Sequence, residues 1–185
     1  VKILLVNKIY SQILLLLKKI SKIHRIDKII FTTHGATVII LLNNGNILPV
    51  IDYETIFDSQ FEKEYTRNQK CSFSETLTPL LPRGLLLSKS IFYYLKKTVK
   101  NISLIESILF YPQYFAWKLS GVQSSEITYF GCHSDLWSFK RKDFSSFVIK
   151  NNLKNKFPQI YKSWSNLGKI KKNIVKKTNI NPNCQ

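Results

Sequence analysis

Residues 111–137 read YPQYFAWKLSGVQSSEITYFGCHSDLW and carry the most definite local structure signals in the chain. Pro112 suits the first turn of a helix, where its missing N–H has no partner to lose. Phe115 and Leu119 follow at helical spacing, and Gly121 can end the helix in the left-handed conformation. The stretch therefore predicts a capped helix, a second turn and a short extended piece that ends at Trp137.

The residues before this stretch alternate between helical and extended patterns. Apolar residues recur every three or four positions over residues 9–23, which predicts a basic amphipathic helix packed on a core. Two β-rich runs follow, at residues 26–33 and 37–42. The sequence Asn-Gly within residues 43–46 is a hairpin signal, and it leads to a third run at 47–51. A helix followed by such runs indicates an α/β fold, with a mixed sheet and flanking helices.

The middle and the end of the chain give a mixture of loop and helix signals. Six of the eleven acidic residues lie in residues 52–75, where weak periodicity predicts a long loop with one helical turn at most. Further helices are expected at residues 88–99, 103–110, 144–150, 158–167 and 169–177, with a charged turn at 139–143. Residues 179–185 show no core pattern. No linker divides the chain, so a single domain is expected.

Composition indicates a folded protein rather than a disordered tail. Hydrophobic residues make up 44% and aromatic residues 13% of the 185 residues. The longest aliphatic runs are far shorter than the roughly 20 residues that a membrane-spanning helix needs, so no membrane partner is expected. The three cysteines are odd in number and unrelated in spacing, which argues against a disulfide framework and favours a cytoplasmic location.

The formal net charge of +17 has two interpretations. It can mark a lysine-rich module that binds nucleic acid or another anionic surface. Alternatively, it follows from coding bias, because Lys, Ile and Asn share A/T-rich codons. Only four of the 28 positive residues are arginine, the side chain that readers of bases and phosphates use most. We therefore expect no specific nucleic-acid partner and keep the anionic-surface module as the alternative.

Several kinds of site are not supported by the motifs. There is no G-x-x-x-x-G-K-[ST] or G-x-G-x-x-G sequence, so no complete phosphate-binding loop is present. Metal-ligand spacing is absent. Cys132 and His133 are adjacent, so in an extended chain they point to opposite faces. A pairing of Cys132 with His34 has no support in the spacing, and a buried, inert thiol is expected instead.

Two short segments are better candidates for binding. His34 and Gly35 follow a β-rich run, where an imidazole can hydrogen-bond a hydroxylated ligand and a glycine lets that ligand approach the backbone. Asp52, Tyr53 and Glu54 follow another such run and can converge on the same place. The alternatives are a turn histidine at a strand end and a solvated loop start.

Five collinear pieces resemble the FGGY carbohydrate kinases, which have an actin-like, ribonuclease-H-like fold. They are residues 29–36 (IIFTTHGA), 48–54 (LPVIDYE), 78–85 (TPLLPRGL), 111–121 (YPQYFAWKLSG) and 125–137 (SEITYFGCHSDLW). The last is the most specific of them. Together they extend over nearly the whole chain and are most similar to the fuculokinase and rhamnulokinase branch. The resemblance implies ATP-dependent phosphorylation of a sugar hydroxyl, with a ketose or deoxyketose as the expected substrate.

The same resemblance implies which residues do what. His34, Gly35 and Asp52 are expected to contact sugar hydroxyls, with Glu54 and Arg83 as weaker candidates. The family's catalytic aspartate deprotonates the attacking hydroxyl while Mg²⁺ stabilises the transferred phosphoryl group. That aspartate is expected beyond Gln185.

The resemblance also implies that parts of the kinase are missing. Residues 1–185 are expected to be a partial amino-terminal, sugar-binding domain without the Asp-x-Gly phosphate motif and without the carboxy-terminal nucleotide domain. ATP and Mg²⁺ would then serve the parent enzyme and bind this part poorly. The absence of methionine and the start at Val1 agree with a fragment, and a degraded gene product is the third interpretation.

Overall fold

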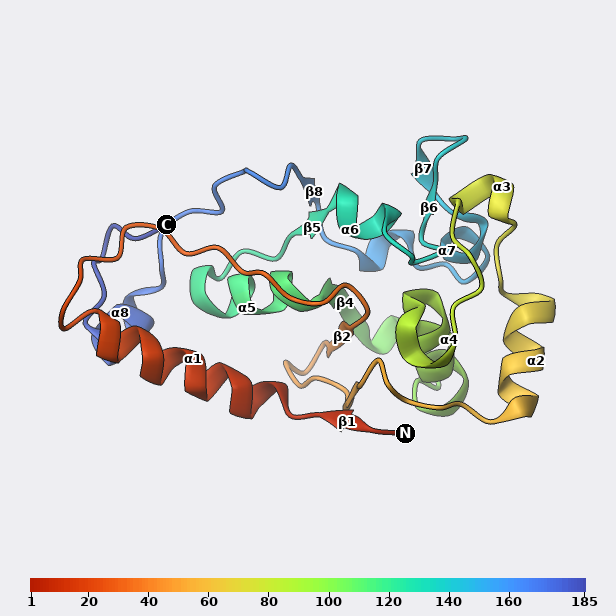
Figure 1. The fold of residues 1–185 in the computed structure, drawn as a ribbon, viewed down its shortest axis with the longest axis horizontal. Helices are drawn as coiled ribbons and strands as arrows, with labels where there is room; N and C mark the ends of the chain where they lie inside the picture. Colours follow the sequence, from red (N-terminus) through yellow and green to blue (C-terminus); the bar gives the residue numbers. More distant parts are fainter.

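The computed structural model describes all of residues 1–185. Its helices are α1 (Val6–Ile20), α2 (Ser59–Asn68), α3 (Phe73–Thr76), α4 (Leu87–Lys97), α5 (Tyr111–Ser120), α6 (Ile127–Gly131), α7 (Ser146–Lys150) and α8 (Lys172–Thr178). Its strands are β1 (Ile3–Leu4), β2 (Val38–Leu42), β3 (Val50–Ile51), β4 (Ile105–Phe110), β5 (Ser125–Glu126), β6 (Trp137–Ser138), β7 (Asp143–Phe144) and β8 (Ile160–Tyr161). Figure 1 shows β2 and β4 near the middle of an elongated molecule, with α1, α5 and α8 toward one end and α2, α3 and α7 toward the other.

The antiparallel pair β2–β4 is the centre of the fold, and both of its faces are buried. Val38 and Ile40 belong to a large core cluster that includes residues of α2, α4 and α6. Ile39 and Leu109 point to the opposite face and pack in a second cluster with α1 and α5. This division follows from the alternation of side chains along a strand. The predicted mixed α/β class with flanking helices is confirmed.

The helix predicted for residues 103–110 is wrong, because residues 105–110 form strand β4. Its apolar residues can be assigned to either a helix or a strand when they are considered alone. In the structure, residues of β4 pair one by one with β2, from Val38 opposite Phe110 to Leu41 opposite Ser107. Burial on both sides of the ladder therefore decides between the two patterns.

The predicted hairpin after β2 is confirmed. Leu42 N–H donates to Asn46 O at 2.8 Å, and Gly45 N–H donates to Leu42 O at 2.8 Å. Gly45 has φ +81°, the left-handed conformation that its position in the turn requires. The chain then returns through Ile47 to β3, which pairs with β1.

The two helices predicted at residues 9–23 and 88–99 are confirmed, with ends shifted by one to three residues. Helix α1 begins at Val6 and ends at Ile20. Its buried face carries Val6 and Leu17, whereas Leu16, which the periodicity assigned to the core stripe, is 55% exposed. The other face of α1 thus remains apolar and uncovered.

Several predictions for loops and helices were wrong. Residues 59–68 form α2 rather than a loop, because the Asp58 carboxylate caps the Phe61 N–H at 2.8 Å. Residues 158–167 contain the short strand β8 instead of a helix. Residues 26–33 are not assigned to a strand. Ile180 and Cys184, in the tail without a core pattern, are buried in a third cluster with Leu17 of α1.

The first part of the stretch 111–137 forms the capped helix that its sequence predicts. Pro112 lies in the first turn of α5, and Gly121 ends the helix with φ +86°. The helix predicted at residues 144–150 is confirmed as α7, and the one at 169–177 as α8, while β6, β7 and the turn between them contain the predicted charged turn. No helix in the structure has the length and apolar character required to cross a membrane.

Candidate functional site

The turn at His34 and Gly35 is held in an aromatic surrounding. The His34 ring centroid lies 4.6 Å from that of Tyr53 and 4.9 Å from that of Tyr111. Its Nε2 is 2.9 Å from Thr37 Oγ1, and the Tyr129 hydroxyl donates to the His34 carbonyl at 2.7 Å. Three separate segments therefore fix the position of this histidine.

The protonation state of His34 follows from this surrounding. Burial against the two rings lowers the pKa of His34, and the negative charge of Asp52 opposes the shift without cancelling it. The imidazole is consequently neutral at pH 7. A neutral imidazole has one donor and one acceptor nitrogen. With Nε2 engaged by Thr37, Nδ1 is left to serve a ligand.

Asp52 lies directly after β3 on the same side of the molecule. Its Oδ1 accepts from the Glu54 N–H at 2.8 Å, and its own N–H donates to Lys2 O at 3.0 Å. Its charge also contributes to the raised pKa of Tyr111, where burial is the larger cause. The Asp52 carboxylate therefore lies near His34 and Tyr111, and its second oxygen is not used in these contacts.

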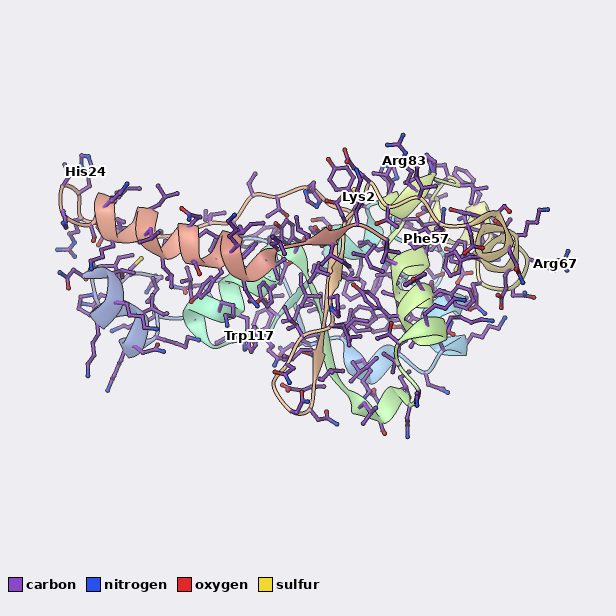
Figure 2. All side chains as sticks on the ribbon, turned by 90° about the horizontal axis from the view of Figure 1, so that it is seen from below. Lys2, His24, Phe57, Arg67, Arg83 and Trp117 are labelled. Carbon is purple, nitrogen blue, oxygen red and sulfur yellow. The ribbon has the colours of Figure 1, made fainter.

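Glu54 and Arg83 lie at the rim. The Glu54 carboxylate accepts from Lys2 Nζ at 2.8 Å, and this bond is the largest cause of the lowered pKa of Glu54. Arg83 acts on Glu54 and Lys2 through its charge, and Figure 2 shows Lys2 and Arg83 on the same part of the surface. These exposed groups add a polar edge with mixed charge.

The absence of a side chain at Gly84 lets the loop that carries Arg83 lie directly against the backbone of residues 52 and 53. A Cβ at this position would lie 3.0 Å from Asp52 O and 3.1 Å from Tyr53 Cα. No other residue fits without movement of the backbone. Arg83 has φ +54°, a conformation that a non-glycine residue adopts only when its neighbours hold it.

The structure thus brings together the residues predicted for the site. His34, Gly35 and Asp52 lie in one region, with Glu54 and Arg83 beside it. Sequence reasoning missed Tyr111 and Tyr129 as neighbours of His34, and it missed the close contact made by Gly84. The available signal was the density of aromatic residues in 111–137, which predicts a core that also supports the sugar pocket.

A second polar cluster surrounds Asp135 of the stretch 111–137 and is largely buried. Asp135 has no exposed surface; its Oδ1 accepts from Lys70 Nζ at 2.9 Å and from Thr76 Oγ1 at 2.7 Å, and its Oδ2 accepts from the Tyr65 hydroxyl at 3.0 Å. The Tyr65 hydroxyl also lies 2.5 Å from Ser88 Oγ. These bonds tie α2, α3 and α4 to the segment before β6. The cluster therefore stabilises the packing of these elements.

The cysteines do not form a catalytic pair. All three are free, and Cys132 is exposed, so the expectation of a buried thiol is wrong for this residue. Cys71 and Cys184 are buried. Burial is the main cause of the raised pKa of both thiols, which keeps them protonated at neutral pH.

The side chains of the chain do not form a set that fits a metal ion. No group of three or more His, Cys, Asp or Glu side chains could hold a metal ion. The acidic side chains next to His34 are Asp52, which caps its own turn, and Glu54, which is paired with Lys2. We therefore derive no catalytic step through Mg²⁺ or ATP from these residues.

Comparisons with known proteins find relatives by structure. No protein-family model matches the sequence, and no curated protein shows a significant match. A carbohydrate kinase from Novosphingobium aromaticivorans superposes with a TM-score of 0.91 at 28% sequence identity, over 99% of this chain and 39% of that chain. A xylulose kinase and a gluconate kinase from Lactobacillus acidophilus give TM-scores of 0.81 and 0.78, each at 15% identity over 96% of this chain and 37% of theirs.

These matches define the fold of the chain. The chain spans less than two fifths of the length of each neighbour, and the matches cover 96–99% of its own length. The names of these neighbours do not specify the fuculokinase and rhamnulokinase branch. The chain therefore has the actin-like α/β fold of a part of the FGGY-type carbohydrate kinases, which are its structural neighbours.

Proposed function

We propose that residues 1–185 form the sugar-binding part of an ATP-dependent carbohydrate kinase. The single observation that carries the proposal is the match to a carbohydrate kinase along 99% of the chain, with a TM-score of 0.91 and 28% identity. On this proposal the chain is a partial amino-terminal domain, and the carboxy-terminal nucleotide domain lies outside it. The kinase neighbours do not favour the lysine-rich nucleic-acid module.

The chemistry of the candidate site supports a polyhydroxylated ligand. The free oxygen of the Asp52 carboxylate can accept hydrogen bonds from one or two hydroxyls, and bonds to a charged acceptor are the stronger kind. The neutral His34 offers Nδ1 to a further hydroxyl. Tyr53, which is partly exposed, can present ring surface to the C–H groups of a sugar. Gly35 leaves room beside the backbone because no atom lies within 4 Å of where its Cβ would be.

The substrate proposed is a neutral ketose or deoxyketose, as in the branch that the sequence resembles. The residues of this chain bind and orient the hydroxyl that receives the phosphoryl group. The proton of that hydroxyl goes to an aspartate that the proposal places outside residues 1–185. ATP and Mg²⁺ would be bound mainly by the remainder of the enzyme.

Replacing Asp52 with asparagine tests the sugar contact. Asparagine keeps the Oδ1 acceptor for the Glu54 N–H, so the turn is preserved while the charge is removed. We expect the Kd for a bound ketose to rise about tenfold or more, since a hydrogen bond to a charged group contributes roughly 1.5–3 kcal/mol. Titration of the 185-residue chain with a panel of ketoses, followed by amide chemical shifts, measures the Kd.

The matched control is Asp143→Asn, on the distant pair β6–β7, where the carboxylate bonds Lys154 at 3.1 Å. This variant should bind the same ketose with unchanged Kd. Equal affinity of the Asp52 variant and the unmodified chain would exclude Asp52 as a sugar contact.

The 185-residue chain alone is expected to show no sugar phosphorylation. The residues that would bind the nucleotide and deprotonate the hydroxyl are proposed to lie elsewhere. Incubation with ATP, Mg²⁺ and the ketose panel, with ³¹P NMR to detect sugar phosphate, checks this expectation. Product formed at a rate above that of a Asp52→Asn sample would disprove it.

A further inference from the structure

Thr37 comes directly before β2, and its side chain is buried beside the ring of His34. The residue is 1% exposed. Its Oγ1 lies 2.9 Å from His34 Nε2, and the hydroxyl makes no other hydrogen bond in the structure. Because β2 is paired along its length at the centre of the fold, Thr37 is held by a rigid element, whereas His34 lies in the turn that precedes it.

The hydrogen bond between Thr37 and His34 can run in two directions. Either the hydroxyl donates to an unprotonated Nε2, or a protonated Nε2 donates to the hydroxyl oxygen. In the second case the hydroxyl proton of Thr37 would be buried without an acceptor, whereas in the first case only lone pairs of its oxygen stay unused. A buried donor without a partner is the rarer and more costly of these two defects. The Thr37 hydroxyl is therefore the donor.

This direction determines where the imidazole carries its proton. The pKa of His34 is lowered, mainly by burial, so the neutral ring holds a single proton. Since the lone pair of Nε2 accepts from Thr37, that proton is on Nδ1. Nδ1 makes no hydrogen bond within the protein. Its N–H group is therefore available to a ligand.

The same bond also fixes the orientation of the His34 ring. The ring packs against Tyr53 and Tyr111, with centroid distances of 4.6 and 4.9 Å, and the Tyr129 hydroxyl holds the His34 carbonyl at 2.7 Å. A half-turn of the ring would place a carbon atom against the Thr37 hydroxyl and leave that buried group without an acceptor. Thr37 thus selects one orientation and one tautomer together.

We propose that Thr37 is a positioning residue that holds His34 as its Nδ1–H tautomer, so that the candidate site presents a hydrogen-bond donor at His34 and an acceptor at Asp52. That a sugar uses this pair rests on the proposed function, whereas the tautomer does not. The oxygen that meets His34 must accept a hydrogen bond, and the hydroxyl that meets Asp52 must donate one. A sugar hydroxyl can do either. The ammonium group of an amino sugar has no lone pair, so it is rejected at His34.

Nitrogen-15 NMR of the histidine side chains tests the tautomer in the 185-residue chain without a ligand. Protonated and unprotonated ring nitrogens differ widely in chemical shift, and a His34→Gln variant identifies the His34 signals among those of the three histidines. At a pH above the pKa of His34, we expect a protonated Nδ1 and an unprotonated Nε2. A protonated Nε2 would overturn the proposal.

Substitution of Thr37 tests its control over the ring. In Thr37→Val the Nε2 signal should move toward the protonated position by about half of the difference or more, because the bond that selects the tautomer is lost. Thr37→Ser keeps the hydroxyl and should keep the original signals. The matched control is Thr178→Val, which removes an equally buried hydroxyl that bonds the Ile174 carbonyl in α8 and should leave His34 unchanged. Unchanged His34 signals in Thr37→Val would contradict the proposal.

Titration with the ketose panel connects the tautomer to binding. Because affinity falls with the fraction of the chain in the binding-competent form, the Kd should rise about twofold or more in Thr37→Val and return to its original value in Thr37→Ser. An unchanged Kd in a Thr37→Val chain whose tautomer has shifted would overturn the donor role of His34. The expected tautomer in a chain that binds no ketose would reject the sugar site and support the role of Thr37. Ketose binding by a chain with a protonated Nε2 would do the reverse.

Discussion

Replacing Asp135 with alanine is expected to destabilise the chain by about 3–5 kcal/mol, the usual cost of removing one partner from a buried ion pair. Lys70, whose side chain is 12% exposed, would keep its charge in the interior without the carboxylate. Thr76 and Tyr65, both buried, would lose an acceptor at the same time. The effect is large because three elements depend on a single side chain.

Urea unfolding followed by circular dichroism measures this change as a shift of the midpoint. The matched control is Asp143→Ala, which removes an exposed carboxylate that pairs with Lys154. Exposed pairs contribute about 0–1 kcal/mol, so the control should unfold close to the original midpoint. A loss below about 1 kcal/mol for the Asp135 variant would mean that water replaces the carboxylate and that the cluster does not hold the elements together.

Replacing Phe130 with alanine should cost about 3–5 kcal/mol, the range for large aromatic residues in a core. Phe130 is 1% exposed, and its ring lies 4.8 Å from Phe110, 5.0 Å from Phe157 and 5.3 Å from Phe144, measured between centroids. Together with Trp137, these make four aromatic rings around Phe130. Rigid rings cannot collapse into the space that alanine leaves. The transfer and cavity contributions therefore add.

Thermal or urea unfolding of the Phe130→Ala chain measures the loss. Phe73→Ala serves as the control, because Phe73 is 61% exposed and makes no ring contact. Its midpoint should change little. Similar losses for the two variants would show that the aromatic cluster packs loosely in solution.

Much of the fold could be predicted where local signals and tertiary packing agree. Helix α5 has a proline at its start and a glycine at its end, so its limits are encoded locally. Strand β4 could not be distinguished from a helix, because its assignment depends on pairing with β2 about seventy residues earlier. Helix α2 was missed although its capping signal, Asp58 three residues before Phe61, is present in the sequence.

The sequence predicted individual residues of the candidate site, but not the contacts that hold them together. His34 and Asp52 were chosen because each follows an extended run, and the ends of such runs carry ligands in α/β folds. The contact of Tyr111 with His34 depends on how α5 packs against the sheet, and no spacing in the sequence reports this. The exposed face of α1 was likewise hidden, since periodicity shows a stripe and not which side is covered.

The third core cluster has a consequence for the order in which the chain folds. Leu17 of α1 is buried by Ile170, Ile174 and Ile180, and Ser21 Oγ bonds the Thr178 carbonyl across 157 residues of sequence. Contacts of such separation form late, because the intervening chain must first be ordered. During synthesis α1 leaves the ribosome long before α8 exists, with apolar side chains uncovered on both of its faces. Helix α1 therefore keeps part of its apolar surface uncovered until α8 has been synthesised.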